Sequence, residues 1–420
     1  MSAERMGMTS TVSGYLLQAL GIGLFCLAVK HWPGAAKSFV YFALLLNMIT
    51  MVPAVVSDSI YGAITFGLLM NAACGWIAGY YLYHMTRNTP AEHRALAFGI
   101  GYGLATLVSW LMTLIGGGAF YYSEYILAVC GGMTLLAFGV IHRTHAKAGD
   151  AGMQSVPVRV AAAKSRERTS LIPAALLIFL FGLVNSSGFS FSVTGVDMTV
   201  SIELSRIVYG AGLIIAGIVT DRSRQYGAIT ALTVLVIPFI ILALQGEALP
   251  AAVFWMLSYF TFGFYSVYRV ILFSDIACER GTVWLVAAGL AIGRTGEAAG
   301  EGIFLSLKDH FALLVLLTAL LFILSVIVFF FVYHRQYLKE PEPGSERERF
   351  ERFAIQHDLS SREREVLRMI IEEKTNAEIA EALCISENTV KFHVRNLLQK
   401  TGCRNRKELH SEYYQAGNPL

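Results

Sequence analysis

Basic side chains are concentrated in one stretch near the C-terminal end of the chain. Residues 388–407 contain no Asp or Glu, whereas the segment before them is rich in Glu. Guanidinium and ammonium groups gathered in this way bind phosphate, and such binding weakens as salt is added. Charge alone favours a plain solvated helix face. The secondary structure around the stretch is therefore needed to tell whether it binds phosphate. The basic residues are Lys391, Arg395, Lys400, Arg404, Arg406 and Lys407.

A second set of ionisable residues lies within long apolar runs. Arg294, Glu297 and Glu301 are spaced three and four residues apart, so they share one face of a helix. Arg206 and Arg269 lie in two other apolar runs. Ionised groups inside a bilayer are costly unless they are paired or face a cavity. Two interpretations stay open: the groups pair with one another and fix helix packing, with Arg269 or Arg206 neutralising the second glutamate, or they line a polar cavity for a ligand or a proton.

Residues that could support catalysis or hold a metal do not form a site in the sequence. The six cysteines show no paired ligand spacing, and we find no phosphate-binding glycine loop and no nucleophile with a base. We therefore expect no enzyme activity, no cofactor and no metal. The cysteines are Cys26, Cys74, Cys130, Cys278, Cys384 and Cys403.

Helix starts are marked around the basic stretch. An N-cap residue followed three positions later by a carboxylate satisfies the free amides of a first helical turn. A fourth start, Ser386, follows directly on a break at residues 383–385, so two short helices meet at a tight turn in the helix-turn-helix layout. The three capping pairs are Ser360 with Glu363, Thr375 with Glu378, and Asn405 with Glu408.

Apolar residues recur with a helical period in three consecutive segments. These faces predict a small common core, and charge separates the third helix from the other two. The apolar residues are Val366, Leu367, Ile370 and Ile371 in the first segment, Ile379, Ala380 and Leu383 in the second, and Val390, Val394 and Leu397 in the third.

This segment closely resembles the LuxR-type helix-turn-helix. The family pattern L-S-x-R-E-x-E-V-L matches residues 359–367, N-x-E-I-A-x-x-L matches residues 376–383, and I-S-x-x-T-V-K-x-H matches residues 385–393. Thr401 and Cys403 stand where the family usually has Leu and Val. These two departures affect the packing that we expect and leave the function unchanged.

The resemblance implies a recognition helix at residues 387–400 whose Thr389, Lys391, Phe392 and Arg395 turn toward the major groove of double-stranded promoter DNA. Lys391 and Arg395 would read bases or phosphates. The last helix, at about residues 406–414, would form a dimer contact, so we expect a homodimer on a roughly two-fold site. Two residues of the basic stretch complete the DNA-binding set that we predict, namely Lys400 and Arg406.

Most of the chain is too apolar for ordinary soluble domains. Of its 420 residues, 55% are hydrophobic and 15% charged, which predicts an all-α, polytopic membrane protein in contact with lipid. Runs of about 20 apolar residues are long enough to span a bilayer. We count about eleven, and ten or twelve would also fit. They are residues 12–29, 38–56, 60–83, 95–115, 122–141, 171–191, 202–220, 228–245, 251–273, 282–305 and 311–333.

Basic loops orient these runs. With eleven spans, the Lys- and Arg-bearing loops all fall on one side, and the opposite loops at residues 116–121 and 246–250 carry no Lys or Arg. We therefore expect a bacterial inner (cytoplasmic) membrane protein with its C-terminal domain in the cytoplasm, where it can reach DNA. The basic loops are residues 30–37, 87–94, 142–170 and 222–224 and the segment after 334.

A short motif within the apolar region resembles a known family. Residues 217–222, ending in Asp221 and Arg222, resemble the G-x-x-x-D-R loop of the major facilitator superfamily, although Arg224 and Gln225 replace the Gly and Arg that follow it there. The resemblance implies a facilitator-like fold. The alternative is that Asp221 and Arg222 only cap a helix end at the membrane surface.

Five segments follow from this organisation. We predict a first membrane helix bundle at residues 1–141, a cytoplasmic basic loop at 142–170 and a second bundle at 171–333. A linker with a short helix at 334–357 then leads to a four-helix DNA-binding domain at 358–420. Ser345 and Glu348 would cap the linker helix, whose apolar face could pack on that domain.

Two functions fit this sequence. The first is a membrane-bound one-component transcription regulator, in which the membrane part senses a small molecule and the cytoplasmic dimer binds promoter DNA. The second is a facilitator-like transporter with a regulatory C-terminal domain. Uptake into vesicles that requires Glu297 or Glu301 would favour the transporter, and transcription changes without any transport would favour the regulator.

Overall fold

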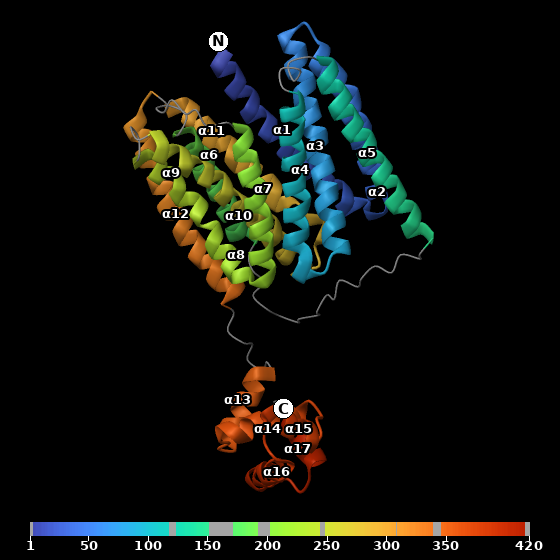
Figure 1. Ribbon diagram of the computed structural model, residues 1–420, viewed down its shortest axis with the longest axis vertical. Helices are drawn as coiled ribbons and strands as arrows, with labels where there is room; N and C mark the ends of the chain where they lie inside the picture. Colours follow the sequence, from blue (N-terminus) through green and yellow to red (C-terminus); the bar gives the residue numbers. More distant parts are fainter. Residues whose placement is uncertain are drawn as a thin grey trace. The chain divides into compact units, whose positions relative to one another are not determined.

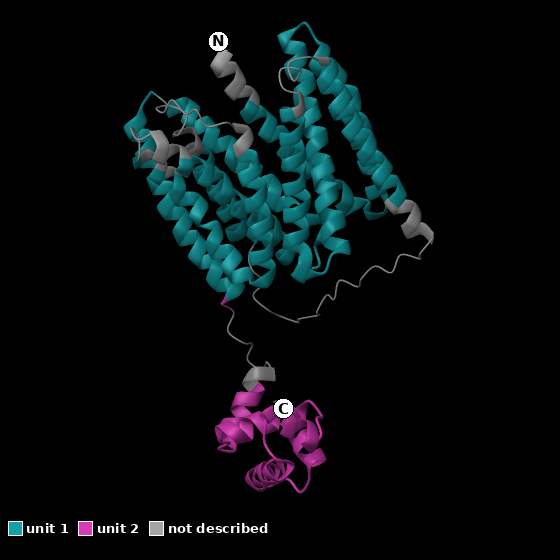
Figure 2. Cartoon of the chain, in the orientation of Figure 1, with its two compact units in different colours: residues 1–337 teal, residues 338–420 magenta. Residues whose placement is uncertain are grey.

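The computed structural model describes the backbone of residues 3–116, 123–150, 171–191, 202–243, 248–307, 309–338 and 346–415. The basic loop beyond residue 150 and the predicted helix cap at Ser345 lie outside these ranges. Within them, every regular element is a helix. The chain divides into two compact units, Met1–Tyr337 and Leu338–Leu420 (Figure 2), whereas the finer division of the first unit into two bundles stays a prediction.

The first unit is built mainly from long helices (Figure 1). Short 3-10 helices, η1 (Pro33–Ala35), η2 (Ala91–His93) and η4 (Val283–Leu285), precede three of them. The α-helices are α1 (Ala3–His31), α2 (Ala36–Val56), α3 (Ile60–Asn88), α4 (Arg94–Gly116), α5 (Ser123–Asp150), α6 (Leu171–Phe191), α7 (Ile202–Arg222), α8 (Arg224–Ala231), α9 (Thr233–Ala243), α10 (Ala248–Glu279), α11 (Ala288–Leu307) and α12 (Phe311–Tyr337).

Seven helical segments among the described residues are long and apolar enough to cross a membrane, so the chain is a multi-pass membrane protein. Two shorter apolar segments, Leu171–Ser186 and Arg224–Ile237, add to them. The eleven spans expected from the sequence are not all reached by this criterion. α11 carries three ionisable residues in its 20 residues, and the predicted run at 228–245 is divided between α8 and α9.

Helices of the N-terminal part of the first unit pack against later helices in two pairs. α4 packs along α7, and α1 packs along α11 (Figure 1). On one side of these pairs α3 contacts both α1 and α2, and on the other side α11 contacts α6. The helix pairs α4 with α7 and α1 with α11 thereby join helices α1–α5 to the helices from α6 onward.

Glycines allow the backbones to approach closely at these crossings. A Cβ on Gly296 would lie 2.2 Å from the carbonyl oxygen of Phe179, so α11 and α6 touch backbone to backbone. A Cβ on Gly99 of α4 would lie 2.4 Å from the carbonyl oxygen of Leu213 in α7. Both helix pairs therefore depend on having no side chain at these positions.

The second unit is a small helical domain with one apolar core. Its helices are α13 (Glu346–Gln356), α14 (Ser361–Ile371), α15 (Asn376–Leu383), α16 (Glu387–Thr401) and α17 (Arg406–Gln415). The predicted apolar faces meet in this core, with Val366, Ile379 and Val390 fully buried. The predicted linker helix is α13, and its apolar face packs on the domain as the sequence suggested: Phe353 is buried against Tyr413 of α17 with ring centroids 5.6 Å apart.

Local capping sets the helix starts of this domain. Ser360 and Glu363 form a reciprocal capping box at α14, and Thr375 and Glu378 form another at α15, as the sequence predicts. At α17 the Asn405 side chain accepts a hydrogen bond from the Glu408 amide at 2.9 Å. The Glu408 carboxylate accepts from the Arg404 amide instead of from Asn405, so this third pair is only half of a box.

We expect Gly296→Ala to lower the melting temperature of the full chain in detergent. The new methyl group would overlap the Phe179 carbonyl, and overpacking of this kind costs about 1–3 kcal/mol. Gly302→Ala is the matched control, because a Cβ there meets nothing within 4 Å and alanine favours a helix more than glycine. Thermal unfolding should rank Gly302→Ala at or above the unsubstituted protein, and equal stability of the two variants would disprove the close contact.

Candidate DNA-binding surface and buried charge cluster

α16 follows α15 after a tight turn. Cys384 takes the left-handed conformation, with φ 52°, at the C-terminal end of α15, and the Ile385 amide donates to the Ala380 carbonyl at 2.9 Å. Ser386 then caps α16 by accepting a hydrogen bond from the Thr389 amide at 3.1 Å. The chain therefore passes from α15 to α16 within three residues, 384–386.

The two faces of α16 differ in burial. Val390 and Leu397 are fully buried in the domain core. Lys391 and Arg395, one turn apart, are exposed, and Phe392 between them is 53% exposed. Neither Lys391 nor Arg395 has a hydrogen-bond or ion-pair partner within the described part of the chain. This face, which we call the α16 face, presents two cations and an aromatic ring to solvent.

The other predicted DNA-binding residues have contacts inside the domain. The Thr389 hydroxyl lies 2.8 Å from the Ser386 hydroxyl at the start of α16. Lys400 donates to the Asp358 carbonyl at 2.7 Å and to the Glu363 carboxylate at 2.8 Å. Arg406 donates to the Asn376 side chain at 3.3 Å and to the Lys374 carbonyl. The structure thus groups Lys391, Phe392 and Arg395 on one surface and uses Lys400 and Arg406 to join helices.

The contact between Lys400 and Glu363 joins α16 to α14, and sequence reasoning missed it. Glu363 is 4% exposed, and its Oε2 atom also accepts a hydrogen bond from the Ser360 amide at 2.8 Å. Burial raises the pKa of this carboxyl, but the hydrogen bonds from Lys400 and Ser360 outweigh burial and hold the pKa below its ordinary value of 4.5. One carboxylate therefore caps α14 and fixes the far end of α16.

A second group of residues, Arg269, Arg294 and Glu297, forms what we call the charge cluster in the membrane unit. Arg269 of α10 donates to one oxygen of Glu297 at 2.5 Å, and Arg294 donates to the other at 2.6 Å. The side chain of Arg269 is 1% exposed and that of Glu297 is 4% exposed. Both arginines therefore bind the first glutamate of α11, whereas the sequence suggested Arg269 or Arg206 as the partner of the second, Glu301.

The remaining two predicted members, Arg206 and Glu301, have other contacts. Arg206 of α7 donates to the Ser109 hydroxyl of α4 at 3.4 Å. Glu301, one turn beyond Glu297, lies near enough to Tyr15 to act on it electrostatically. The structure therefore brings three of the five predicted membrane residues into direct contact.

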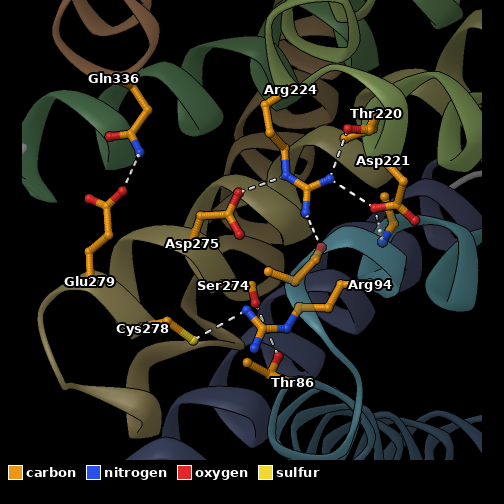
Figure 3. A network of polar contacts seen from close by, with 12 residues as sticks. Thr86, Arg94, Thr220, Asp221, Arg224, Ser274, Asp275, Cys278, Glu279 and Gln336 are labelled. Atoms are coloured by element: carbon orange, nitrogen blue, oxygen red, sulfur yellow. Dashed lines mark hydrogen bonds and ion pairs between the residues drawn. The ribbon is translucent and has the colours of Figure 1, made fainter. Parts of the chain in front are cut away.

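A polar network lies at the end of the membrane unit where α12 finishes (Figure 3). The Asp221 carboxylate accepts hydrogen bonds from the Ala95 and Leu96 amides at 3.0 and 2.7 Å, so it caps α4 rather than its own helix. Arg224 binds both Asp221 at 2.8 Å and Asp275 of α10 at 3.0 Å. This network ties α4 to α7 and α10.

The same network reaches the last turn of α12. Gln336 donates to the Glu279 carboxylate at 3.3 Å (Figure 3). Gln225 of α8 donates to the Tyr337 carbonyl at 3.0 Å. The last residues of the membrane unit are thus bound to α8 and α10, and through Arg224 and Asp221 to α4.

No group of three His, Cys, Asp or Glu residues that could hold a metal ion occurs within the described ranges. All six cysteines are free thiols.

Comparison with known proteins identifies the C-terminal unit. Residues 357–412 match the family model described as "Bacterial regulatory proteins, luxR family". The chain is 42% identical over 59 residues to the spore germination protein GerE of Bacillus subtilis and covers 80% of it. It is 48% identical over 52 residues to the regulatory protein SdiA of Escherichia coli and 43% identical over 72 residues to the nitrate/nitrite response regulator protein NarP of Escherichia coli. The chain covers only 22% and 31% of these two proteins.

A solved structure resembles most of the chain in fold. The human organic anion transporter MFSD10 (TETRAN) superposes with a TM-score of 0.52 at 16% sequence identity, covering 78% of this chain and 82% of that one. The membrane unit therefore has the fold of a facilitator-type transporter. At this identity the likeness concerns the fold alone.

The C-terminal unit should lose stability in acid because of Glu363. A carboxyl with a lowered pKa contributes its full stabilisation above its pKa in the unfolded chain, and this contribution is lost as the pH falls through the lower pKa of the folded state. We expect urea unfolding of residues 338–420 to show a falling free energy of unfolding below about pH 4.5. Glu363→Gln, which keeps the helix cap and removes the ion pair, should cost about 1 kcal/mol at pH 7 and flatten this dependence. If the free energy of unfolding of Glu363→Gln falls in acid as it does in the unsubstituted domain, another group causes the pH dependence.

Proposed function

Because the chain belongs, through residues 357–412, to the LuxR family of bacterial regulatory proteins, we propose that it is a membrane-bound one-component transcription regulator. In this proposal the membrane unit senses a small molecule, and the C-terminal unit binds promoter DNA as a homodimer. The observation that carries it is the α16 face, with its cations unpaired in the described domain, on a chain that continues into a polytopic membrane unit.

DNA recognition would use the α16 face. Lys391 and Arg395 lie one turn apart on its exposed side, a spacing that lets both side chains reach one stretch of major groove. Phe392 between them could contact a thymine methyl group. Lys400 and Arg406 would act chiefly by holding α16 and α17 in place, since their donors are already engaged.

Dimerisation would use the outward face of α17. Leu409 and Tyr413 of this helix are buried in the domain core, while Lys407, Glu412 and Tyr414 are exposed. An exposed tyrosine beside charged side chains suits a small two-fold contact. The two α16 helices of such a dimer would read two half-sites.

The proposed topology has eleven spans, with α8 and α9 crossing together as one. The basic loops would then lie in the cytoplasm, as would the end of α12 and the DNA-binding domain that follows it. α11 would cross despite its charges, because Arg269 and Arg294 both pair with Glu297.

The polar network at the end of α12 supports a route from sensing to output. Asp221 connects the N-terminal end of α4 to α7, and Gln225 holds the carbonyl of Tyr337. A ligand that prefers one arrangement of these helices would shift the population of states. Movement of α4 relative to α7 would then alter the anchoring of α12, which leads directly into the DNA-binding unit.

The second candidate function is a transporter with a regulatory domain. The likeness of the membrane unit's fold to a transporter favours this candidate. Accumulation of a substrate in vesicles that depends on Glu297 or Glu301 would support this function. Control of transcription by a chain that transports nothing would support the regulator.

Asp221→Ala should change the coupling between the two units. Loss of the caps on α4 would shift the equilibrium by about 1 kcal/mol, which corresponds to roughly a fivefold change in occupancy of chromosomal sites measured by crosslinking and sequencing. Arg222→Ala, in the same turn and without a hydrogen-bond partner in the described chain, should leave occupancy unchanged at equal membrane abundance. The same occupancy for all three proteins would contradict this route.

Lys391→Ala and Arg395→Ala should each weaken binding of residues 338–420 to duplex DNA by about 1–3 kcal/mol, and a lost phosphate contact should reduce the salt slope by about 1. Fluorescence anisotropy over a salt series measures both quantities. Arg352→Ala removes the same charge from the exposed side of α13 and should bind normally. If the unsubstituted domain fails to bind DNA at low salt, the proposed function is wrong.

A further inference from the structure

The charge cluster carries one more positive charge than negative. Two guanidinium groups share the single carboxylate of Glu297, one on each oxygen. Glu301 is the next acidic residue of α11, but within the described residues the ion pairs of Arg269 and Arg294 are both with Glu297. A surplus cation among buried helices is costly unless an anion joins it.

Part of the donor set of the two arginines has no acceptor among the described residues. Each guanidinium has five N–H groups. Arg269 and Arg294 each donate to Glu297, and Arg269 also hydrogen-bonds the Tyr265 hydroxyl. The Nε atoms of Arg269 and Arg294 are both buried and have no hydrogen-bond partner. Unmade hydrogen bonds of buried charged donors cost more than those of neutral groups, so the cluster is incomplete as it stands.

The surroundings of the cluster are aromatic and come from both sides of the membrane unit. Arg269 lies over the ring of Tyr265, with the guanidinium carbon 4.9 Å from its centroid, and Arg294 lies over the ring of Tyr15 at 5.1 Å. Tyr15 belongs to α1, and Tyr102, which also acts on Arg294, belongs to α4. Ring faces attract the cations but supply no acceptor for the in-plane Nε–H groups of the two arginines.

Access differs between the two arginines. The side chain of Arg294 is 15% exposed, whereas that of Arg269 is 1% exposed. An incoming anion would therefore meet Arg294 first, on the side that faces Tyr15 and Tyr102. The site lies where helices of the N-terminal part meet α11, so an occupant would contact both.

We propose that the charge cluster is the ligand site of the membrane unit and binds a small monocarboxylate on the free donors of Arg294 and Arg269. This inference rests on the proposed sensing function and specifies its ligand class. The planar fork of arginine matches a carboxylate with two parallel hydrogen bonds. A single negative charge cancels the surplus, whereas a dianion would reverse it.

The proposal gives the ligand a way to favour one state. A carboxylate on Arg294 brings negative charge next to Tyr15 of α1 and Tyr102 of α4, whose hydroxyl groups can donate to it. The occupied site would therefore hold α1 and α4 against α11. A differential affinity of this kind is what a population shift requires.

The test uses the full chain in detergent with sodium acetate and sodium benzoate as probes, against sodium chloride and the neutral amides acetamide and benzamide, at up to tens of millimolar. We expect at least one carboxylate to raise the melting temperature in a saturable way while chloride and both amides do not. Arg294→Lys, which keeps the charge and loses the fork, should weaken the effect about tenfold. Arg294→Gln should abolish it.

Arg206→Gln is the matched control, because this membrane arginine contacts Ser109 and not Glu297; it should keep the full carboxylate effect. Equal loss in Arg206→Gln and Arg294→Gln, or no carboxylate effect beyond that of chloride, would overturn the site. Lipid discs of phosphatidylcholine with and without phosphatidylglycerol separate a free carboxylate from a lipid headgroup. Stabilisation by phosphatidylglycerol that carboxylates cannot displace would assign the site to lipid and overturn the proposal.

The readout is independent of DNA. If carboxylates fail to bind while site occupancy on the chromosome still depends on the chain, the ligand class is wrong and the proposed function stands. If carboxylates bind through Arg294 but the C-terminal unit binds no DNA, the site stands and the proposed function fails.

Discussion

The pairing of Glu297 with two arginines is the interaction on which the membrane unit depends. A lone carboxylate among buried helices would cost several kcal/mol, and Glu297 avoids this by giving one oxygen to α10 and the other to Arg294 on its own helix. α11 can therefore be a buried helix despite its charges. Since α11 also contacts α6 and α1, this one carboxylate fixes the helix around which the C-terminal part of the unit packs.

The C-terminal unit meets the opposite constraint, because its cations must stay in water while their helix is held firmly. Val390 and Leu397 fix one face of α16 in the core, and Lys400 ties the far end to Glu363. The basic residues thus divide between two tasks: those near the start of the helix stay outward, and Lys400 is used for attachment. A rigid helix presents its side chains with little loss of conformational entropy on binding.

Features governed by near neighbours in the chain were predictable from the sequence. The capping boxes of Ser360 and Thr375 and the period of Val366, Leu367 and Ile370 each depend on residues within one or two turns. The contact of Lys400 with Glu363, 37 residues away, carries no such local signal. The choice between Arg269 and Arg206 also has no local signal, because the sequence allows either arginine to pair with a glutamate of α11. Only the packing of α10 against α11 shows that Arg269 makes this contact.

The short connection between α12 and α13 has a geometrical consequence for assembly. The nine residue steps from Tyr337 to Glu346 can span at most about 30 Å. Two C-terminal units on adjacent half-sites would therefore hold two membrane units within a small patch of bilayer. Pairing on an operator would depend on how many copies occupy each square micrometre of membrane, and the chromosome would have to move to the protein because the protein cannot leave the surface to search for it.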